Sequence, residues 1–202
     1  MFTSELRAYL VVGINWGSSV SRTAAGFAAR VPLHSGTRSD PGAQALAYDR
    51  WVDRPSLYEF AGGDQAFLAL AAATHERCLQ DPELNHPFSN HVGPDHVEHL
   101  AAYWAEVFGG PPRYTSVLGG HSGMLAIHAG QGAPDEMGDR FEACFIQAMD
   151  DAELPADRDF RRALSDYMHW ATREVNSYSP AGIRVEPNQP MPRWTWHGLQ
   201  PA

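Results

Sequence analysis

The sequence has 202 residues, of which 44% are hydrophobic, enough to form the buried core of one domain. Its formal net charge of −9 disfavours nucleic acid and anionic membrane surfaces as partners, because both are bound by clusters of Lys and Arg. No stretch approaches the roughly 18 consecutive apolar residues that a membrane-spanning helix needs. We therefore expect an acidic cytoplasmic protein that binds neither nucleic acid nor a membrane.

The first 52 residues show neither a helical nor an alternating pattern, and several Pro and Gly residues interrupt them. We expect residues 1–52 to form a weakly ordered N-terminal extension. Their Arg and Ser content leaves two alternatives open, a targeting segment or a stretch upstream of the native start.

Helical periodicity begins after this extension. Ser56 predicts the cap of a short helix that stops at Gly62-Gly63. Apolar residues at three- and four-residue spacing then predict four substantial helices, at about 64–79, 95–108, 134–148 and 157–178. No stretch predicts a strand, so the expected fold class is all-α.

The segments between and after these helices are rich in Pro and Gly. We expect a turn region at 82–94, a loop at 113–120 and a tail rich in Pro and Trp at 181–202. Cys78 and Cys144 lie within apolar helical patterns and lack C-x-x-C spacing, which predicts buried free thiols and a reducing compartment.

Ten histidines raise the question of a metal site. His96 and His99 lie three residues apart on one predicted helix and could share a metal ion, but no acidic or Cys ligands at suitable spacing complete a zinc or di-iron set. His128 ends a short apolar run, and Gly130 and Gly132 follow it. Taken alone, this pattern is more typical of a structural histidine than of a metal ligand.

Several motifs nevertheless occur in a characteristic order. They are Leu57-Tyr58 before Gly62-Gly63, Asp81-Pro82-Glu83-Leu84 before Phe88, Tyr103-Trp104 before Phe108-Gly109-Gly110-Pro111 and Tyr114, and Gly120-His121 seven residues before His128. In this order and spacing, the chain from Ser56 to Tyr178 resembles the truncated haemoglobins, most closely their second group. The resemblance implies a globin-like two-over-two helical sandwich at 53–180 that encloses haem b.

The resemblance makes His128 the expected iron ligand, with the opposite haem face open to a diatomic gas. On that distal face His75 stands where relatives usually carry a tyrosine, and Phe141 stands where the second group usually carries a tryptophan. His96 matches a position that is small in many relatives. Because phenylalanine has no polar atom, His75 and His96 are the expected polar groups, although either could instead be exposed at the edge or first turn of its helix.

Five further residues have expected places around the haem. Phe88 matches the aromatic residue that wedges the haem in place, and Leu100 matches the aliphatic residue over the distal face, although both would also suit an ordinary helical core. His99, Arg113 and His121 are candidates to bind the haem propionates by charge-assisted hydrogen bonds, with a solvated surface position as the alternative.

The function implied by this resemblance is reversible binding of O2, NO or CO. Distal donors would slow ligand release, which favours O2/NO redox chemistry or sensing over bulk transport and leaves NO dioxygenase- or peroxidase-like activity open. An unidentified reductase would then be a partner. Two alternatives remain, a bis-histidyl electron-transfer protein in which His75 or His96 binds the iron, and a haem-free interaction domain whose tail from Pro190 to Trp196 docks on a partner or on the domain itself.

Overall fold

The computed structural model describes residues 54–90 and 93–201, so the predicted extension at 1–52 lies outside the described residues. Within these limits the chain forms eight helices and one short hairpin, which confirms the predicted all-α class. None of these helices has the length and apolar character needed to cross a membrane. The four longest match the four predicted helices to within a few residues: α3 (Asp64–Gln80), α5 (His96–Val107), α8 (Asp135–Asp151) and α9 (Arg158–Ser177).

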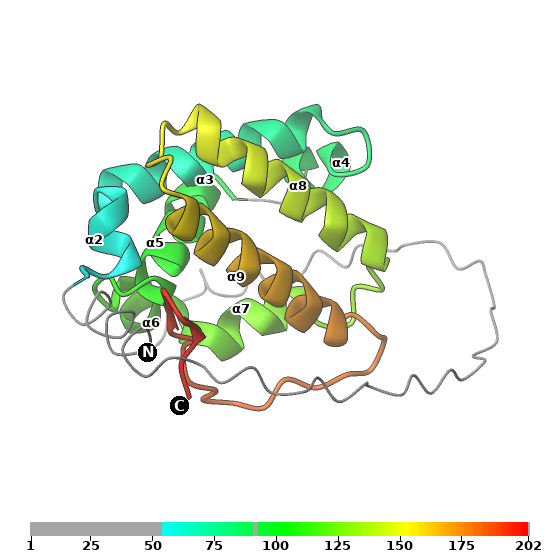
Figure 1. Cartoon of the computed structure of the whole chain (residues 1–202). Helices are drawn as coiled ribbons and strands as arrows, with labels where there is room; N and C mark the ends of the chain where they lie inside the picture. Colours follow the sequence, from blue (N-terminus) through cyan, green and yellow to red (C-terminus); the bar gives the residue numbers. More distant parts are fainter. Residues whose placement is uncertain (1–53, 91–92, 202) are drawn as a thin grey trace, which may run out of the picture. The chain divides into compact units, whose positions relative to one another are not determined.

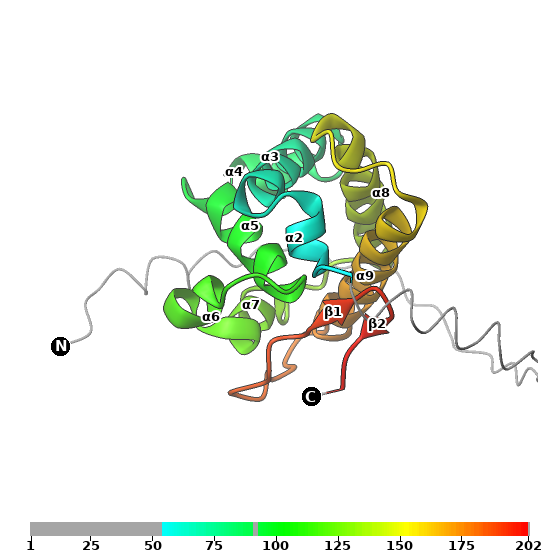
Figure 2. The same cartoon turned by 60° about the vertical axis from the view of Figure 1, so that its left-hand side comes forward.

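The four long helices form two pairs (Figure 1). α3 packs against α5, α8 packs against α9, and α3 also packs against α8. Figure 2 shows the short helix α2 (Leu57–Ala61) with α3 and α5 to one side of it and α8 and α9 to the other. The arrangement is therefore a sandwich of two helix pairs.

Aromatic side chains fill the core between the pairs. Phe67 of α3, Phe108 at the end of α5 and Tyr167 of α9 are each at most 1% exposed. The ring centroids of Phe67 and Phe108 lie 5.5 Å apart, and those of Phe108 and Tyr167 lie 4.8 Å apart. Burying each such side chain contributes roughly 1.5–3 kcal/mol, so this chain of rings holds α9 to the first pair.

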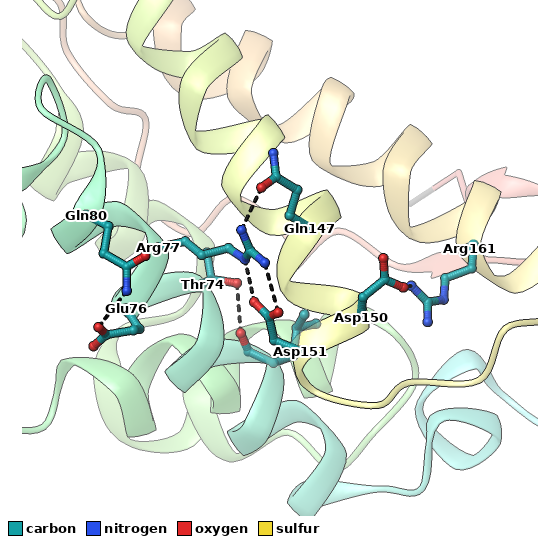
Figure 3. A network of polar contacts seen from close by, with 9 residues as sticks. Thr74, Glu76, Arg77, Gln80, Gln147, Asp150, Asp151 and Arg161 are labelled. Atoms are coloured by element: carbon teal, nitrogen blue, oxygen red, sulfur yellow. Dashed lines mark hydrogen bonds and ion pairs between the residues drawn. The ribbon is translucent and has the colours of Figure 1, made fainter.

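Ion pairs at the helix surfaces set the register between pairs (Figure 3). The Arg77 guanidinium of α3 donates to both carboxylate oxygens of Asp151 and, from Nη1, to the Gln147 Oε1 of α8 at 2.6 Å. Within the second pair, Arg161 of α9 donates to the adjacent Asp150 of α8 at 2.7 Å. Since these carboxylates are largely exposed, the contacts fix geometry more than they add stability.

The predicted helix cap at Ser56 is confirmed. The Glu59 backbone N–H donates to Ser56 Oγ at 3.1 Å, and the Ser56 backbone N–H donates to Glu59 Oε2 at 3.0 Å, which is a capping box. Gly62 ends α2 with a φ of 110°, a left-handed conformation that favours glycine.

Two connections that the sequence presents as irregular are helical. The predicted turn region contains α4 (Asn85–Asn90), and the predicted loop at 113–120 was wrong because α6 (Arg113–Leu118) occupies most of it. Both helices have six residues, too few to show an apolar period. Each is instead held by one buried side chain beside or within it, Leu84 for α4 and Tyr114 for α6.

The predicted absence of strands was also wrong. The tail forms a hairpin of β1 (Trp194–Thr195) and β2 (Gly198–Leu199), whose strands are too short to show alternation. Trp194 is 7% exposed, and its ring centroid lies 5.6 Å from that of Tyr167 and 5.8 Å from that of Trp170, both on α9.

The second tryptophan of the hairpin fastens the tail to the start of the domain. Its ring, that of Trp196, lies edge-on to Phe60 of α2 with centroids 5.0 Å apart, and its Nε1–H donates to the Pro55 carbonyl at 2.8 Å. Of the two docking options for the tail, the structure therefore shows the one on its own domain.

Candidate functional site

Helix α7 (Gly120–His128) carries His128 at its last residue. Gly119, with a φ of 84°, separates α6 from α7, and a Cβ on Gly123 would lie 2.9 Å from the Leu118 carbonyl oxygen, so glycine permits the close approach of the two helices. After α7, the Gly130 backbone N–H donates to the Tyr178 carbonyl at 2.9 Å. The segment bearing His128 is thus tied at both ends.

In the His128 imidazole, one ring nitrogen is hydrogen-bonded, and the other has no hydrogen-bond partner among the described residues. Its Nδ1 lies 2.9 Å from the Met124 carbonyl oxygen. Because a carbonyl can only accept, Nδ1 carries the proton, and Nε2 keeps its lone pair with no hydrogen-bond partner among the described residues. This arrangement, with one ring N–H donated to a backbone carbonyl, is the one found in metal-binding histidines.

The His128 side chain is exposed at the surface of the described structure. Its side chain has accessible surface, yet desolvation by the surrounding protein lowers its pKa, although the bond to Met124 acts in the opposite direction. The imidazole is therefore neutral at neutral pH.

Three rings from three different helices lie close to one another. The centroids of His75 of α3 and His96 of α5 lie 5.4 Å apart, and Phe88 of α4 lies 5.7 Å from each of them. Phe141 of α8 stacks on Phe88 with centroids 5.9 Å apart. The structure therefore brings four of the predicted distal residues into one cluster.

The rings of His75, Phe88 and His96 line a cavity of about 430 Å³, within the range of roughly 300–1,000 Å³ typical of ligand pockets. Apolar side chains form much of its wall, and the imidazoles of His75 and His96 contribute polar nitrogen atoms. Leu100, Phe141 and His128 do not line it directly. The lining residues are His75, Leu79, Phe88, Ser89, Gly93, Pro94, His96 and Val97.

The imidazoles of His75 and His96 each contain an unsatisfied buried nitrogen. His75 Nδ1 and His96 Nε2 are buried and have no hydrogen-bond partner among residues 54–90 and 93–201. Burial lowers the pKa of His96 to about 4, with smaller contributions from the neighbouring His75, His128 and His99. His96 is therefore neutral at neutral pH, and unsatisfied buried nitrogens of this kind occur where a ligand or water completes the hydrogen bonding.

The other predicted residues lie outside the ring cluster. Leu100 is partly buried and packs against the main core. His99 is partly exposed, and its charge contributes to the lowered pKa of His96. Arg113 is exposed and forms an ion pair with Asp64. In the described part of the chain, no three His, Cys, Asp or Glu residues are grouped closely enough to hold a metal ion.

His121 has a different environment from the one expected. It is 3% exposed, its Nδ1 lies 2.7 Å from the Tyr103 hydroxyl, and its Nε2 lies 3.2 Å from Glu174 Oε1. Both ring nitrogens are thus engaged inside the protein. The sequence did not predict that Tyr103 and Glu174 contact His121. Tyr103 stood out in the sequence only as part of the Tyr103-Trp104 motif.

The two cysteines pack against the aromatic pair of Phe88 and Phe141. Cys78 and Cys144 are buried and free, and they pack with Phe88 and Phe141 in a second, smaller core cluster. Burial raises the pKa of both thiols, so neither is a ready nucleophile or ligand.

Known proteins share this fold. The haemoglobin of the thermophilic phototrophic bacterium Chloroflexus aurantiacus is 25% identical, with 60% of this chain and 98% of that chain covered and a TM-score of 0.53. The thermostable haemoglobin of the actinobacterium Thermobifida fusca is 26% identical, with 67% and 100% covered and a TM-score of 0.51. The group II truncated haemoglobin of Bacillus anthracis, 19% identical with 68% and 96% covered and a TM-score of 0.51, is similar in fold alone.

Comparison of the sequence with known protein families also identifies a globin. No curated protein matches the chain. The family model described as bacterial-like globin, however, matches residues 56–173, which is more than half of the chain. The chain therefore belongs to the bacterial-like globin family and has a truncated globin fold.

Proposed function

We propose that this haem-binding globin holds haem b through His128 and binds a diatomic gas, O2 or NO, on the opposite face of the haem. The observation that supports His128 most strongly is its tautomer. The bond from Nδ1–H to the Met124 carbonyl leaves the Nε2 lone pair free, which is what an axial iron ligand requires. Ferrous haem supplies the position at which the gas binds.

The distal face in this proposal is formed by His75 and His96. Each has a buried nitrogen without a partner, and a neutral imidazole can donate an N–H bond to a gas ligand that carries partial negative charge. One such bond contributes roughly 0.5–1.5 kcal/mol, so two donors slow ligand release by about one to two orders of magnitude. Slow release suits O2/NO redox chemistry or sensing better than bulk transport.

Apolar side chains complete the proposed pocket. Phe88 and Phe141 stack beside the two imidazoles, and Leu100 extends the same side of α5. His99 is the propionate partner we retain, because its side chain has no competing bond among the described residues. Arg113 would first have to leave Asp64, and we leave His121 out because both its nitrogens are engaged.

The test is the visible spectrum after haem reconstitution. The wild type should show a Soret band with the features of histidine-ligated haem, and His128→Ala should lose them. His169→Ala is the matched control, because His169 is an exposed histidine of α9 paired with Glu142. A colourless reconstituted wild type, or a His128→Ala variant with an unchanged histidine-ligated spectrum, would overturn the proposal.

A second candidate function is supported by one observation. The unpartnered Nε2 of His96 is the type of atom that could bind the iron as a sixth ligand, which would favour electron transfer over gas binding. A low-spin six-coordinate spectrum of the reduced protein, lost in His96→Leu but retained in His75→Phe, would support this candidate.

The haem-free interaction domain is less well supported. Trp194 and Trp196 pack on α2 and α9 of their own domain, so this surface is not offered to a partner. If gas chemistry is the function, a reductase must return the iron to the ferrous state. We place both proteins in the cytoplasm, because the two buried free thiols suit a reducing compartment.

A further inference from the structure

The start of α7 is held by a buried polar network that the gas-binding site does not use. The Tyr103 hydroxyl of α5 lies 2.7 Å from His121 Nδ1, and Glu174 Oε1 of α9 lies 3.2 Å from His121 Nε2. Because an ionised carboxylate can only accept, Nε2–H donates to Glu174, and the Tyr103 hydroxyl donates to Nδ1. One imidazole therefore bridges a helix of each pair.

The next residue adds a third attachment. Ser122 Oγ donates to the Glu186 carbonyl of the tail at 2.8 Å and accepts from the Gln189 backbone N–H at 2.8 Å. Within one turn, α7 is thus bonded to α5, to α9 and to the tail. The tail in turn is fixed by its buried Trp194.

Apolar packing alone leaves the rotation of α7 weakly defined. Three of its nine residues are buried: Gly120, His121 and Leu125. Of these, only Leu125 has an apolar side chain. Hydrophobic contact is not directional, whereas hydrogen bonds depend on angle. The directional contacts at the start of α7 are therefore the bonds of His121 and Ser122, and those of His121 join α7 to one helix of each pair.

His121 and His128 lie on the same side of this helix. They are seven residues apart, which is about 20° short of two full turns, so His128 follows His121 along nearly the same line. An atom about 6 Å from the axis moves by about 1 Å when the helix rotates by about 10°. A small rotation allowed at His121 would thus displace His128 Nε2 by a distance that matters for a metal bond.

We propose that His121 is a positioning residue, whose bonds to Tyr103 and Glu174 fix the rotation of α7 and so orient the His128 imidazole. The part of this proposal that makes His128 an iron ligand rests on the proposed function, whereas the restraint on α7 does not. Burial raises the pKa of Tyr103, which keeps its hydroxyl protonated as the donor this network needs.

Two variants break the network with little change of shape. Tyr103→Phe removes only the hydroxyl, and His121→Phe replaces one flat ring by another that has no nitrogen. Tyr114→Phe is the matched control, because Tyr114 is a buried neighbour whose ring stacks edge-on to Tyr103 but does not bond to His121. His121→Gln, which can both accept and donate, should restore part of the wild-type behaviour.

The first measurement is hydrogen exchange of the α7 amides in protein without haem. Tyr103→Phe and His121→Phe should speed exchange between Met124 and His128 by about 10- to 100-fold, because a buried hydrogen bond has been lost. Tyr114→Phe should leave these rates near those of the wild type. Equal rates in all variants would overturn the restraint.

The second measurement is the Fe–His stretching band of ferrous haem-loaded protein just after photolysis of bound CO. This band reports the bond between iron and its axial histidine, so loss of global stability alone does not shift it. It should shift or broaden in Tyr103→Phe and His121→Phe and keep its wild-type position in Tyr114→Phe. An unchanged band in the first two variants would overturn the positioning role.

The two measurements separate failure of this inference from failure of the proposed function. If the wild type binds no haem, the proposed function fails and the part of this inference that concerns an iron ligand fails with it. The exchange rates in α7 would still test whether the bonds of His121 restrain this helix, since that measurement needs no haem.

Discussion

Removal of the His96 imidazole should weaken the dependence of stability on pH. Burial, together with nearby histidines, lowers the pKa of His96 from 6.5 to about 4 in the folded protein, whereas in the unfolded chain it returns to its ordinary value. Between these two values the unfolded chain therefore binds more protons than the folded protein. The free energy of unfolding should fall as the pH is lowered through this window.

The size of this effect follows from the width of the window. A difference of about two and a half units at 1.36 kcal/mol per unit amounts to about 3 kcal/mol for the wild type between pH 6.5 and 4. Above pH 6.5 neither state holds the proton, and below pH 4 both hold it, so this contribution to the pH dependence ends at each limit.

Urea unfolding of the protein without haem, at several pH values between 6.5 and 4, measures this dependence. His96→Gln is the comparison, since glutamine is polar and of similar size but does not titrate. Contributions from carboxylates are common to both proteins and cancel in the difference. Equal pH dependence in the wild type and His96→Gln, or an NMR titration of His96 near 6.5, would refute the reasoning.

Three further outcomes follow from the packing. Trp194→Ala should lower the free energy of unfolding by about 3 kcal/mol in urea, the lower end of the range for such changes, because the lost indole N–H was itself unsatisfied. Gly123→Ala should cost about 1–3 kcal/mol in thermal or urea unfolding, because its Cβ would press on the Leu118 carbonyl oxygen at 2.9 Å. Cys78 and Cys144, at 0% and 9% exposure, should react with a thiol reagent only when urea unfolds the protein, and fast reaction in native buffer would contradict their burial.

The long helices could be predicted from the sequence because their buried faces are long enough to show a period. In α3, the residues that the structure buries recur at three- and four-residue spacing: Phe67, Leu70, Ala71, Thr74 and Cys78. The six-residue helices α4 and α6 and the two-residue strands of the tail have no such signal. Their conformation depends on contacts with residues distant in sequence, which a local pattern does not contain.

The candidate site shows the same division. His75, Phe88 and His96 could be proposed together because they match positions of a known family, although their spacing along the chain does not indicate that they meet. The contact between His121 and Glu174 joins residues 53 positions apart, and neither local periodicity nor the family motifs predicted it. Burial of a histidine between two polar partners is a property of the packed helices.

The measurement that tests the central claim most directly is imidazole rescue of His128→Gly. The variant should lose the spectrum of histidine-ligated haem, because no other free imidazole nitrogen is proposed for that face, and added imidazole should restore it by filling the space left by the side chain. Restoration would identify His128 as the axial ligand. A His128→Gly variant that keeps the wild-type ferrous spectrum without added imidazole would contradict that assignment.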